Sequence, residues 1–430
     1  MTMEYNHVVT SFLQRGPFIL LLRRSKKVGT YQGRWAGVSG FLQKDEDPNE
    51  RAKTEISEET GLVSNELSLI RSGETVRVYD PEKETVWIVH PFLFATNQPA
   101  ISVNWENSEY EWVEPEQLAY FETVPSLRQT FDRVRWDLAN PPANLSKAIE
   151  IVDGIAHDKI HGASYLGKRT IDAIGTAACL SIAQTNIDLF RDLLMIVTRM
   201  RNVQPNMASI RNIAGRLLYD IDLACQTAVS ITEYKNLIEQ LTRKTLASCT
   251  SAAELVSEKL SSIIIRKRRI LTHSYSGTVK RAIHLCRNRE LQVYVTESGP
   301  MFEGKRLARE LTDLGFKTTV ISDNAIYDFP VKFDAVVVGA DSVLCDGSII
   351  NKIGTKAVAR NAKQHSIPVY VAAERSKLDT MQFLGSPLQL NEIFDLTPSD
   401  LITSIITERG EMNPYDVRDQ MKSLVRELYT

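Results

Sequence analysis

Short runs of β-forming residues, separated by turn signals, open the chain. HVVTSFLQ (His7–Gln14) and PFILLLRRS (Pro17–Ser25) lie on either side of a Gly-Pro turn. ETVRVYD (Glu74–Asp80) and TVWIVHPFLFAT (Thr85–Thr96) flank an Asp-Pro break and predict a hairpin. EYEWVEPEQL (Glu109–Leu118) predicts one more strand followed by a helix start. This pattern predicts an α+β domain over residues 1–137.

The pattern then changes to apolar residues at helical spacing. The segment LANPPANLS, residues 138–146, has the proline and asparagine content of a linker. From residue 147 to residue 261 the apolar positions recur every three to four residues, as in Leu189–Met200 and Ile213–Val229. We therefore expect a helical subdomain over this region.

Strand-like and helical runs alternate over residues 262–430. The strand-like runs are RRILTHS, LQVYVTES, KTTVISD, DAVVVGAD and PVYVAAE, and helical runs such as Gly304–Gly315 fall between them. Such alternation predicts a doubly wound parallel sheet, hence an α/β fold. Ligands of such sheets bind at the carboxyl ends of the strands. The polar residues at those ends are Ser274 to Thr278, Glu297, Asp323, Asp341 and Glu374.

Composition narrows the class of protein. A length of 430 residues exceeds one ordinary core, and a net charge of -2 argues against a strongly basic nucleic-acid binder. The sequence has no apolar run of the roughly 20 residues that a membrane span needs, and we see no secretory signal. The five cysteines are odd in number and form no CxxC pair, so we expect a reduced, cytoplasmic protein without a membrane partner.

An acidic stretch near the N-terminus predicts a capped helix. Asp47 and Pro48 suit the N-cap and first helical positions, the helix should run to about Thr60, and Gly61 suits the position after its end.

Three glutamates of this helix are spaced so that they share one face. Glu55, Glu58 and Glu59 repel one another there, which destabilises an isolated helix. A divalent cation, Mg²⁺ or Mn²⁺, would compensate this repulsion and would in turn bind substrate phosphates. The alternative is a solvated acidic face that Arg51 and Lys53 balance.

The full spacing of the stretch resembles the Nudix box, G-x5-E-x7-R-E-U-x-E-E-x-G-U, in which U is a bulky apolar residue. The residues in register are Gly40, Glu46, Glu55, Ile56, Glu58, Glu59, Gly61 and Leu62. The resemblance covers about residues 1–137 and implies an α/β/α sandwich.

The same resemblance implies Mg²⁺-dependent hydrolysis of a nucleoside diphosphate linked to another moiety. It implies that Glu55, Glu58 and Glu59 hold the metal, that Glu46 assists, and that the backbone at Gly40 approaches the site. One position departs, because the family's arginine is Thr54 here. That arginine orients a catalytic glutamate through a charge-assisted bond. We hypothesise that Arg51, one turn earlier, substitutes for it in part.

The last part of the chain carries a second set of motifs. LTHSYSGTVKRA (Leu271–Ala282) is a strand, a Ser/Gly/Thr turn and a helix start, where backbone N–H groups can bind an anion. VVVGADSVLCDGSIINKIGT (Val336–Thr355) and VYVAAERSKLD (Val369–Asp379) follow. Together they resemble the family of the alpha, beta and delta subunits of translation initiation factor 2B, which also contains the methylthioribose-1-phosphate and ribose-1,5-bisphosphate isomerases. The resemblance covers about Lys147–Tyr429.

This second resemblance implies a sugar-phosphate or nucleotide site. Asp341 matches the aspartate of the isomerases' proton transfer, Asn351 and Lys352 match a substrate-contacting pair, and Lys377 matches a lysine near the phosphate. The turn supplies further substrate-binding candidates: Ser274, Ser276, Gly277 and Thr278. Simpler structural roles are the alternative, in which Asp341 caps a turn and Asn351 and Lys352 flank a helix.

Four positions depart from the isomerase pattern. The catalytic cysteine expected after His273 is Ser274, whose hydroxyl has a far higher pKa than a thiol and is a poor acid or base. Three arginines expected at the phosphate are His161, Gln204 and Gly299. We therefore expect a ligand-binding domain that does not isomerise its ligand.

Three functions remain open from the sequence. The first is a Nudix-type hydrolase whose C-terminal domain senses a ligand and, by resemblance, forms a homodimer. The second is a regulatory protein related to initiation factor 2B, with a translation-factor partner and an inactive, nucleotide-binding Nudix domain. The third is a residual sugar-phosphate isomerase.

Overall fold

The computed structural model describes the chain except for residues 1–3, 16–17, 82, 97, 99, 114, 136–142, 201–202, 287–289, 328–331, 384–387 and 430. Contacts between Cα atoms divide the chain into two compact units, Met1–Asn140 and Pro141–Leu428, and each is considered by itself below. Residues 138–142 of the expected linker lie outside the described residues, and its last residues, from Ala143, form a short 3-10 helix and the start of a helix.

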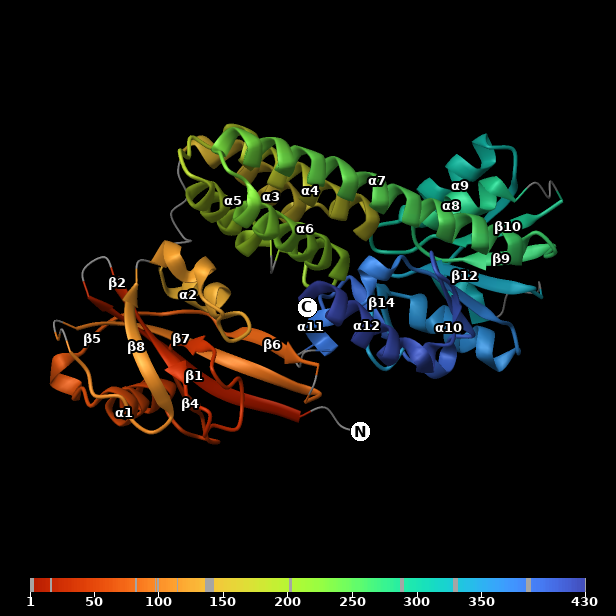
Figure 1. The fold of residues 1–430 in the computed structure, drawn as a ribbon. Helices are drawn as coiled ribbons and strands as arrows, with labels where there is room; N and C mark the ends of the chain where they lie inside the picture. Colours follow the sequence, from red (N-terminus) through yellow and green to blue (C-terminus); the bar gives the residue numbers. More distant parts are fainter. Residues whose placement is uncertain are drawn as a thin grey trace. The chain divides into compact units, whose positions relative to one another are not determined.

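An eight-stranded sheet forms the centre of the N-terminal unit (Figure 1). Its strand order is β3-β2-β1-β7-β5, with β4, β6 and β8 paired to β1, β7 and β2. Strands β1 and β7 run parallel, and β6 and β7 form the expected antiparallel hairpin. The strands are β1 (Glu4–Arg15), β2 (Phe18–Arg24), β3 (Trp35–Ala36), β4 (Val38–Phe41), β5 (Ser68–Ser72), β6 (Val76–Asp80), β7 (Thr85–Ala95) and β8 (Asn107–Val113).

Alternate residues of β1 face two different apolar layers, as the period of two in a strand requires. Val9 packs in one cluster with Ile56 of helix α1 (Pro48–Thr60). Phe12 packs in another with Phe131 of helix α2 (Leu127–Arg135), at 4.9 Å between ring centroids. A helix therefore covers each face of the sheet, and the α/β/α sandwich is confirmed.

One local prediction for this unit was wrong, and one strand was missed. The helix start expected after β8 is a 3-10 helix, Pro115–Tyr120, and α2 begins only at Leu127. Strand β5 was not expected. Its side chains are mostly exposed, so it lacks the buried alternation by which a sequence indicates a strand.

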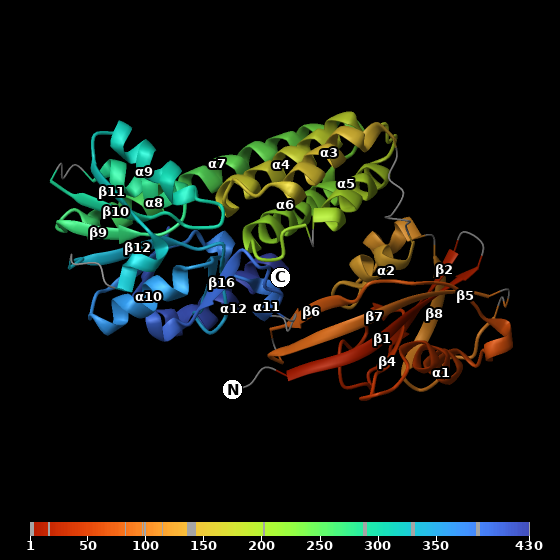
Figure 2. The same cartoon turned by 180° about the vertical axis from the view of Figure 1, so that it is seen from behind.

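Five helices open the C-terminal unit, as the helical spacing predicted (Figure 2). The longest, α7, has 34 residues and a length of about 51 Å. It contacts α4 and α6 in the helical part and also α8, β15 and β17 of the sheet part. These helices are α3 (Ser146–His157), α4 (Ala163–Leu180), α5 (Asn186–Met200), α6 (Ala208–Thr227) and α7 (Ile231–Ile264).

A seven-stranded sheet follows, in the order β11-β10-β9-β12-β15-β17-β18. All neighbours are parallel except the edge pair β17 and β18. All five expected strands are present, which confirms the parallel sheet. The strands are β9 (Arg269–Thr272), β10 (Gln292–Thr296), β11 (Lys317–Ile321), β12 (Ala335–Gly339), β15 (Val369–Ala372), β17 (Ser404–Thr407) and β18 (Gly410–Met412).

Helices cover both faces of this sheet. Helices α7, α8 and α9 share one buried cluster with the strands, while α10 contacts β12 from the other side (Figures 1 and 2). This is the doubly wound arrangement. The helices are α8 (Gly277–Leu285), α9 (Glu303–Asp313), α10 (Thr355–Gln364), α11 (Thr380–Phe383) and α12 (Val417–Tyr429).

A second, three-stranded sheet was not expected. It consists of β13 (Ser342–Val343), β14 (Ile349–Lys352) and β16 (Phe394–Thr397), in that order and antiparallel. Asp341, which follows β12 of the main sheet, donates its backbone N–H to the Ile350 oxygen of β14 at 2.9 Å. None of the described helices is long and apolar enough to cross a membrane.

Candidate functional site

The capping predicted for the acidic helix is present in α1. The Asp47 carboxylate accepts hydrogen bonds from the backbone N–H groups of Asn49 and Glu50, at 2.8 and 3.0 Å. Pro48 is the first helical residue, and Gly61 ends the helix with φ of 74°. These local contacts fix the helix that carries the glutamates.

The three glutamates do not share one environment. Glu55 and Glu59 are buried, with 6% and 4% of their surface exposed, whereas Glu58 is exposed. The three side chains of the expected acidic face therefore differ in burial. Glu55 and Glu59 are one turn apart and face strand β4, and Glu58 lies toward solvent.

Strand β4 approaches the two buried carboxylates closely. A Cβ atom on Gly40 would overlap the Glu55 carboxylate, so any larger residue would require the Glu55 side chain to shift. The neighbouring backbone N–H of Ser39 donates a hydrogen bond to Glu59 Oε1 at 3.0 Å. The close backbone approach that the resemblance implied is present in the structure.

Glu59 is the most strongly perturbed of these groups. Burial, with smaller contributions from the charges of Glu55 and Glu106, raises its pKa to about 7, although hydrogen bonds from Asn107 and Ser39 oppose this rise. Asn107 Nδ2 donates to Glu59 Oε2 at 2.7 Å. The sequence reasoning missed Glu106 and Asn107, because they follow the box by more than 40 residues and no spacing rule connects them to it.

Arg51 pairs with Glu55 one turn along α1, through a hydrogen bond from Nη2 to Oε1. Thr54, which stands at the family's arginine position, donates its hydroxyl to the backbone oxygen of Glu50 at 2.9 Å. Burial raises the pKa of Glu55, and the Arg51 charge opposes that rise. The contact that the substitution hypothesis requires is therefore present.

Glu46 lies in the turn before α1. Its Oε2 accepts a hydrogen bond from the backbone N–H of Gln43 at 2.9 Å, so its contact within the described residues is local. In the described part of the chain, no group of three His, Cys, Asp or Glu side chains is arranged so that it could hold a metal ion. The assisting role of Glu46 and the three-glutamate metal site remain predictions.

In the C-terminal unit, the turn after β9 is stabilised by side chains. Ser276 caps α8 by accepting from the backbone N–H of Val279 at 3.3 Å, and Gly277 is the first residue of that helix. Ser274 has a left-handed backbone with φ of 65°, and its hydroxyl donates to Glu303 Oε1 at 3.1 Å. The hydroxyl at the isomerase cysteine position thus contacts a carboxylate.

The buried carboxylate of Glu374 contacts two of the expected ligand-binding residues, Thr278 and Lys377. It accepts from Thr278 Oγ1 at 2.8 Å and from Lys377 Nζ at 2.9 Å, and Ser164 of α4 lies 3.2 Å away. Burial would raise its pKa, but the Lys377 charge and these hydrogen bonds lower the pKa below its usual value. The charge of Lys377 is thus neutralised within the protein.

Asp341 lies nearby and is 6% exposed. Its Oδ1 accepts one long hydrogen bond, of 3.3 Å, from the backbone N–H of Ala163. Burial raises its pKa, and the charges of Lys377 and Lys352 oppose that rise. The structure therefore brings Asp341, Lys352 and Lys377 into one electrostatic environment.

Asn351 and Lys352 make contacts of the structural kind. Asn351 Nδ2 donates to Thr355 Oγ1 at 3.0 Å, at the start of α10. Lys352 Nζ lies 4.6 Å from the centre of the Phe394 ring. These contacts favour helix-flanking roles for the pair, while Lys352 retains its electrostatic influence on Asp341.

The three residues that replace expected arginines have structural partners. Gln204 Nε2 donates to the carbonyl oxygens of Ile155 and Ala156 at 3.1 Å, which caps the end of α3. His161 Nδ1 is 2.7 Å from Asp158 Oδ2. The Gly299 backbone N–H donates to Asp323 Oδ2 at 2.7 Å. Each of the three positions therefore makes a local contact within the fold.

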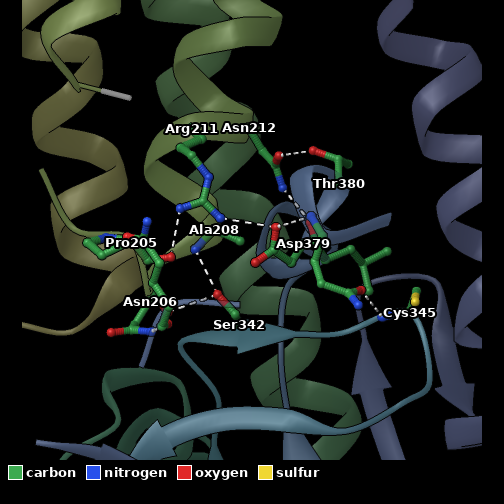
Figure 3. Close-up of polar contacts among 12 residues, drawn as sticks. Pro205, Asn206, Ala208, Arg211, Asn212, Ser342, Cys345, Asp379 and Thr380 are labelled. Carbon is green, nitrogen blue, oxygen red and sulfur yellow. Dashed lines mark hydrogen bonds and ion pairs between the residues drawn. The ribbon is translucent and has the colours of Figure 1, made fainter. Parts of the chain in front are cut away.

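Figure 3 shows a polar cluster, also missed from the sequence, that joins α6 to the segment after β15. Arg211 donates to Asp379 Oδ1 at 3.0 Å, and Asn212 donates to the carbonyl oxygen of Leu378 at 2.6 Å. Thr380 donates in turn to Asn212 at 2.7 Å. Because Asp379 follows Lys377 by two residues, this cluster fixes the segment that carries the buried lysine.

Comparison with known families agrees with this two-part architecture. The family model described as the initiation factor 2 subunit family matches residues 159–389, which is more than half of the chain. The chain belongs to this family. The model described as the NUDIX domain matches residues 6–134, so a NUDIX domain precedes the family's own domain.

Similar proteins cover the C-terminal part. Ribose 1,5-bisphosphate isomerase of Pyrococcus furiosus is 28% identical over 305 residues, which are 64% of this chain and 93% of that protein. A putative translation initiation factor eIF-2B subunit 2-like protein of Pyrococcus abyssi is 30% identical, over 62% of this chain and 97% of that protein. The crystal structure of Pyrococcus horikoshii eIF-2B has a TM-score of 0.54 at 29% identity, and the match covers 62% of this chain and 97% of that one.

Proposed function

We propose that this chain is a divalent-metal-dependent hydrolase of a nucleoside-diphosphate-linked substrate, with a C-terminal domain that binds a sugar phosphate or nucleotide without isomerising it. The observation that carries the proposal is the pair of buried carboxylates, Glu55 and Glu59, held against the backbone of Gly40. Burying two neighbouring carboxylates is unfavourable unless a cation compensates them.

The donor set suits Mg²⁺ or Mn²⁺, which prefer hard carboxylate oxygens. Glu55, Glu58 and Glu59 would hold the metal, which when bound supplies an activated water and neutralises phosphate charge. A cation at Glu55 would take the place that the Arg51 guanidinium holds in this structure. Glu106, whose charge already raises the pKa values of Glu55 and Glu59, would add to the negative potential.

The protein's own groups orient this chemistry. Ser39 N–H and Asn107 Nδ2 each bind one oxygen of Glu59 and thereby fix the plane of its carboxylate. Because the pKa of Glu59 is about 7, its carboxyl group loses its proton near neutral pH. The resulting carboxylate is a stronger metal ligand than the neutral acid. Glu46 would assist from the turn before the helix.

The C-terminal domain supports binding better than isomerisation. Ser274 replaces the thiol and its hydroxyl donates to Glu303, while Lys377 is paired with Glu374. A hydroxyl in this setting is a poor proton-transfer group at neutral pH. We propose a ligand-sensing and homodimerising role for this domain, in a reducing cytoplasm that suits the free thiols of the four described cysteine side chains.

A second candidate is a regulatory protein with a translation-factor partner, in which the NUDIX domain binds nucleotides without turnover. Thr54 favours this candidate, because it stands at the position of the motif's arginine and its hydroxyl donates to the helix backbone instead of to a catalytic glutamate. The third candidate, ribose-1,5-bisphosphate isomerisation, would return if such turnover were detected and were lost in Asp341→Asn.

The test is turnover on a panel of ADP-ribose, nucleoside-diphosphate sugars, dinucleotides and nucleoside triphosphates with Mg²⁺. Glu58→Gln is compared with Glu50→Gln, which alters an exposed glutamate of the same helix that pairs with Lys53. We expect turnover that Glu58→Gln abolishes and Glu50→Gln leaves unchanged. Absence of turnover on every compound would reject the hydrolase and favour the regulatory candidate.

A further inference from the structure

The helical part of the C-terminal unit has an open groove of about 710 Å³. It runs along helices α3, α4 and α7, which lie side by side (Figures 1 and 2). Ligand-binding clefts in proteins have volumes of roughly 300–1,000 Å³. The groove is therefore large enough for a small organic ligand, and it shares no residue with the polar contacts around Glu374.

One face of α4 and one face of α7 form the walls of the groove, because the lining residues recur at helical spacings. They include Arg169, Asp172 and Cys179 of α4, and Lys235, Glu239 and Leu246 of α7. The two helices are antiparallel here, since Lys235 Nζ donates to the Ser181 oxygen just after α4 at 2.8 Å, and Thr242 lies beside Gly175. Helix α4 rises by about 15 Å between Arg169 and Cys179, which sets the length of the groove.

The floor of the groove is apolar. Ile171 and Ala178 of α4 and Ile238 of α7 line it and are 1% to 5% exposed. Gly175 leaves space above this floor, because even a Cβ atom there would lie 3.7 Å from Thr242 Cγ2. An apolar chain laid on this floor would be removed from water, which favours its binding.

The rim of the groove carries one positive charge that no acid balances. Arg169 pairs with Asp172 at 3.1 Å, and Arg243 pairs with Glu239 at 2.5 Å. Lys235, within the described part of the chain, donates to a neutral backbone oxygen and pairs with no carboxylate. The groove therefore complements a ligand that has one negative group at the Lys235 end and an apolar body over the floor.

We propose that this groove binds a single-chain acyl carboxylate, with the carboxylate at Lys235 and the chain along α4 toward Leu246. A groove of about 15 Å accommodates an extended chain of about ten to twelve carbon atoms. The inference is independent of the proposed hydrolase, because all of the lining residues belong to the helical part of the C-terminal unit. A ligand bound there would stabilise the packing of α3, α4 and α7, since it binds the folded state.

The test is calorimetric titration of the full chain with octanoate, decanoate and laurate, each below the concentration at which it forms micelles. We expect the affinity to rise about fourfold for each added methylene group. Lys235→Met should weaken the binding of decanoate about fivefold and leave that of 1-decanol, which has no charge, unchanged. Lys244→Met is the matched control, because Lys244 is an exposed lysine of α7 that does not line the groove.

A larger side chain at Gly175 should close the groove. We expect Gly175→Leu to abolish the binding of all three acids, and the helix should tolerate the change because leucine is a better helix former than glycine. Circular dichroism checks its folding, and Thr242→Phe provides a second blocking variant if Gly175→Leu does not fold. Laurate should also slow the reaction of a maleimide with Cys179, an exposed thiol of the groove, and not with Cys345, which does not line it.

Three results would overturn the proposal. The first is the absence of binding by every acid, and the second is binding that survives in the folded blocking variant. The third is a loss of decanoate in Lys235→Met that 1-decanol or the Lys244→Met control shares equally. Light scattering of Gly175→Leu tests another occupant, because a fall in molecular mass would assign the groove to a second copy of the chain and would also overturn the proposal.

Discussion

Arg51 donates a hydrogen bond to Glu55 one turn further along the acidic helix, whereas Thr54, at the motif's arginine position, bonds the helix backbone. The positive charge therefore stands three residues before the motif's arginine position and contacts a buried glutamate.

Removing this charge should reduce hydrolysis. We expect Arg51→Ala to lower kcat/KM by about 10- to 100-fold, because one charge-assisted hydrogen bond contributes about 1.5–3 kcal/mol. The acidic limb of the pH profile should move to higher pH, since Arg51 opposes the rise in the pKa of Glu55. Lys53→Ala on the same helix is the control, as its partner Glu50 is exposed. Unchanged turnover in Arg51→Ala would show that the substitution hypothesis is wrong.

Glu59 should make the stability of the metal-free protein depend on pH. Its pKa in the folded protein is about 7, against an ordinary value of 4.5 for a glutamate, so the folded state binds this proton more tightly than the unfolded state does. The stabilisation of the folded state by this proton is complete at pH values below the pKa of Glu59 in the unfolded chain. It is lost as pH rises through about 7. We expect a loss of about 2–3 kcal/mol in unfolding free energy between about pH 5 and about pH 8.

Urea unfolding with a chelator present measures this dependence. The unfolding free energy of wild type should fall by this amount over the same pH range, whereas that of Glu59→Gln, which has no titrating group at this position, should stay nearly constant. Glu58→Gln is the control, since Glu58 is exposed on the same helix and its replacement should leave the wild-type slope intact. A wild-type slope that survives in Glu59→Gln would contradict the assignment.

The buried pair of Lys377 and Glu374 should be important for stability. Both side chains are 5% exposed, and removing one charge leaves the other uncompensated inside the protein. We expect Lys377→Met to lower the unfolding free energy by about 3–5 kcal/mol. The double variant with Glu374→Gln should recover much of the loss. Lys363→Met, which breaks an exposed pair with Asp400, should cause no measurable change. Equal effects of the two single lysine variants would refute the prediction.

Arg211 should stabilise the contact between helix α6 and the segment that follows β15 (Figure 3). Its side chain is 13% exposed and that of Asp379 is 6% exposed, so we expect Arg211→Met to cost about 3 kcal/mol. Arg216→Met, on the same helix, alters a pair exposed at 44% and 27%, and should cost at most about 1 kcal/mol. Thermal unfolding of both variants compares the two, and similar melting temperatures would argue against a role for the cluster.

Local signals predicted the acidic helix well. Asp47 and Gly61 act on backbone groups within one turn of themselves, so their effect can be deduced from neighbouring residues. Neighbouring residues do not indicate that Glu55 and Glu59 are buried while Glu58 is exposed. This difference depends on where strand β4 packs. Glu106 approaches through the pairing of β8 with β2, a contact between distant segments that no local spacing indicates.

In the C-terminal site too, the sequence indicated some features and not others. The strand-end rule selected Glu374 and Asp341 as candidates for a ligand site, because parallel strands end at one edge of a sheet, and both side chains are buried. It did not indicate that Lys377 pairs with Glu374 instead of remaining available for a phosphate. The small sheet of β13, β14 and β16 was also missed, since its strands have two to four residues and show no usable periodicity.

Helix α7 packs against both the helical part and the sheet part of the C-terminal unit. Its contacts reach α4 and α6 in the helical part and β15 and β17 in the sheet part, without a break over 34 residues. A continuous helix of this length behaves as a stiff rod, because bending it requires loss of backbone hydrogen bonds. The helical part and the sheet therefore cannot hinge apart independently. A tilt imposed on the rod at one end becomes a displacement at the other, some tens of ångströms away.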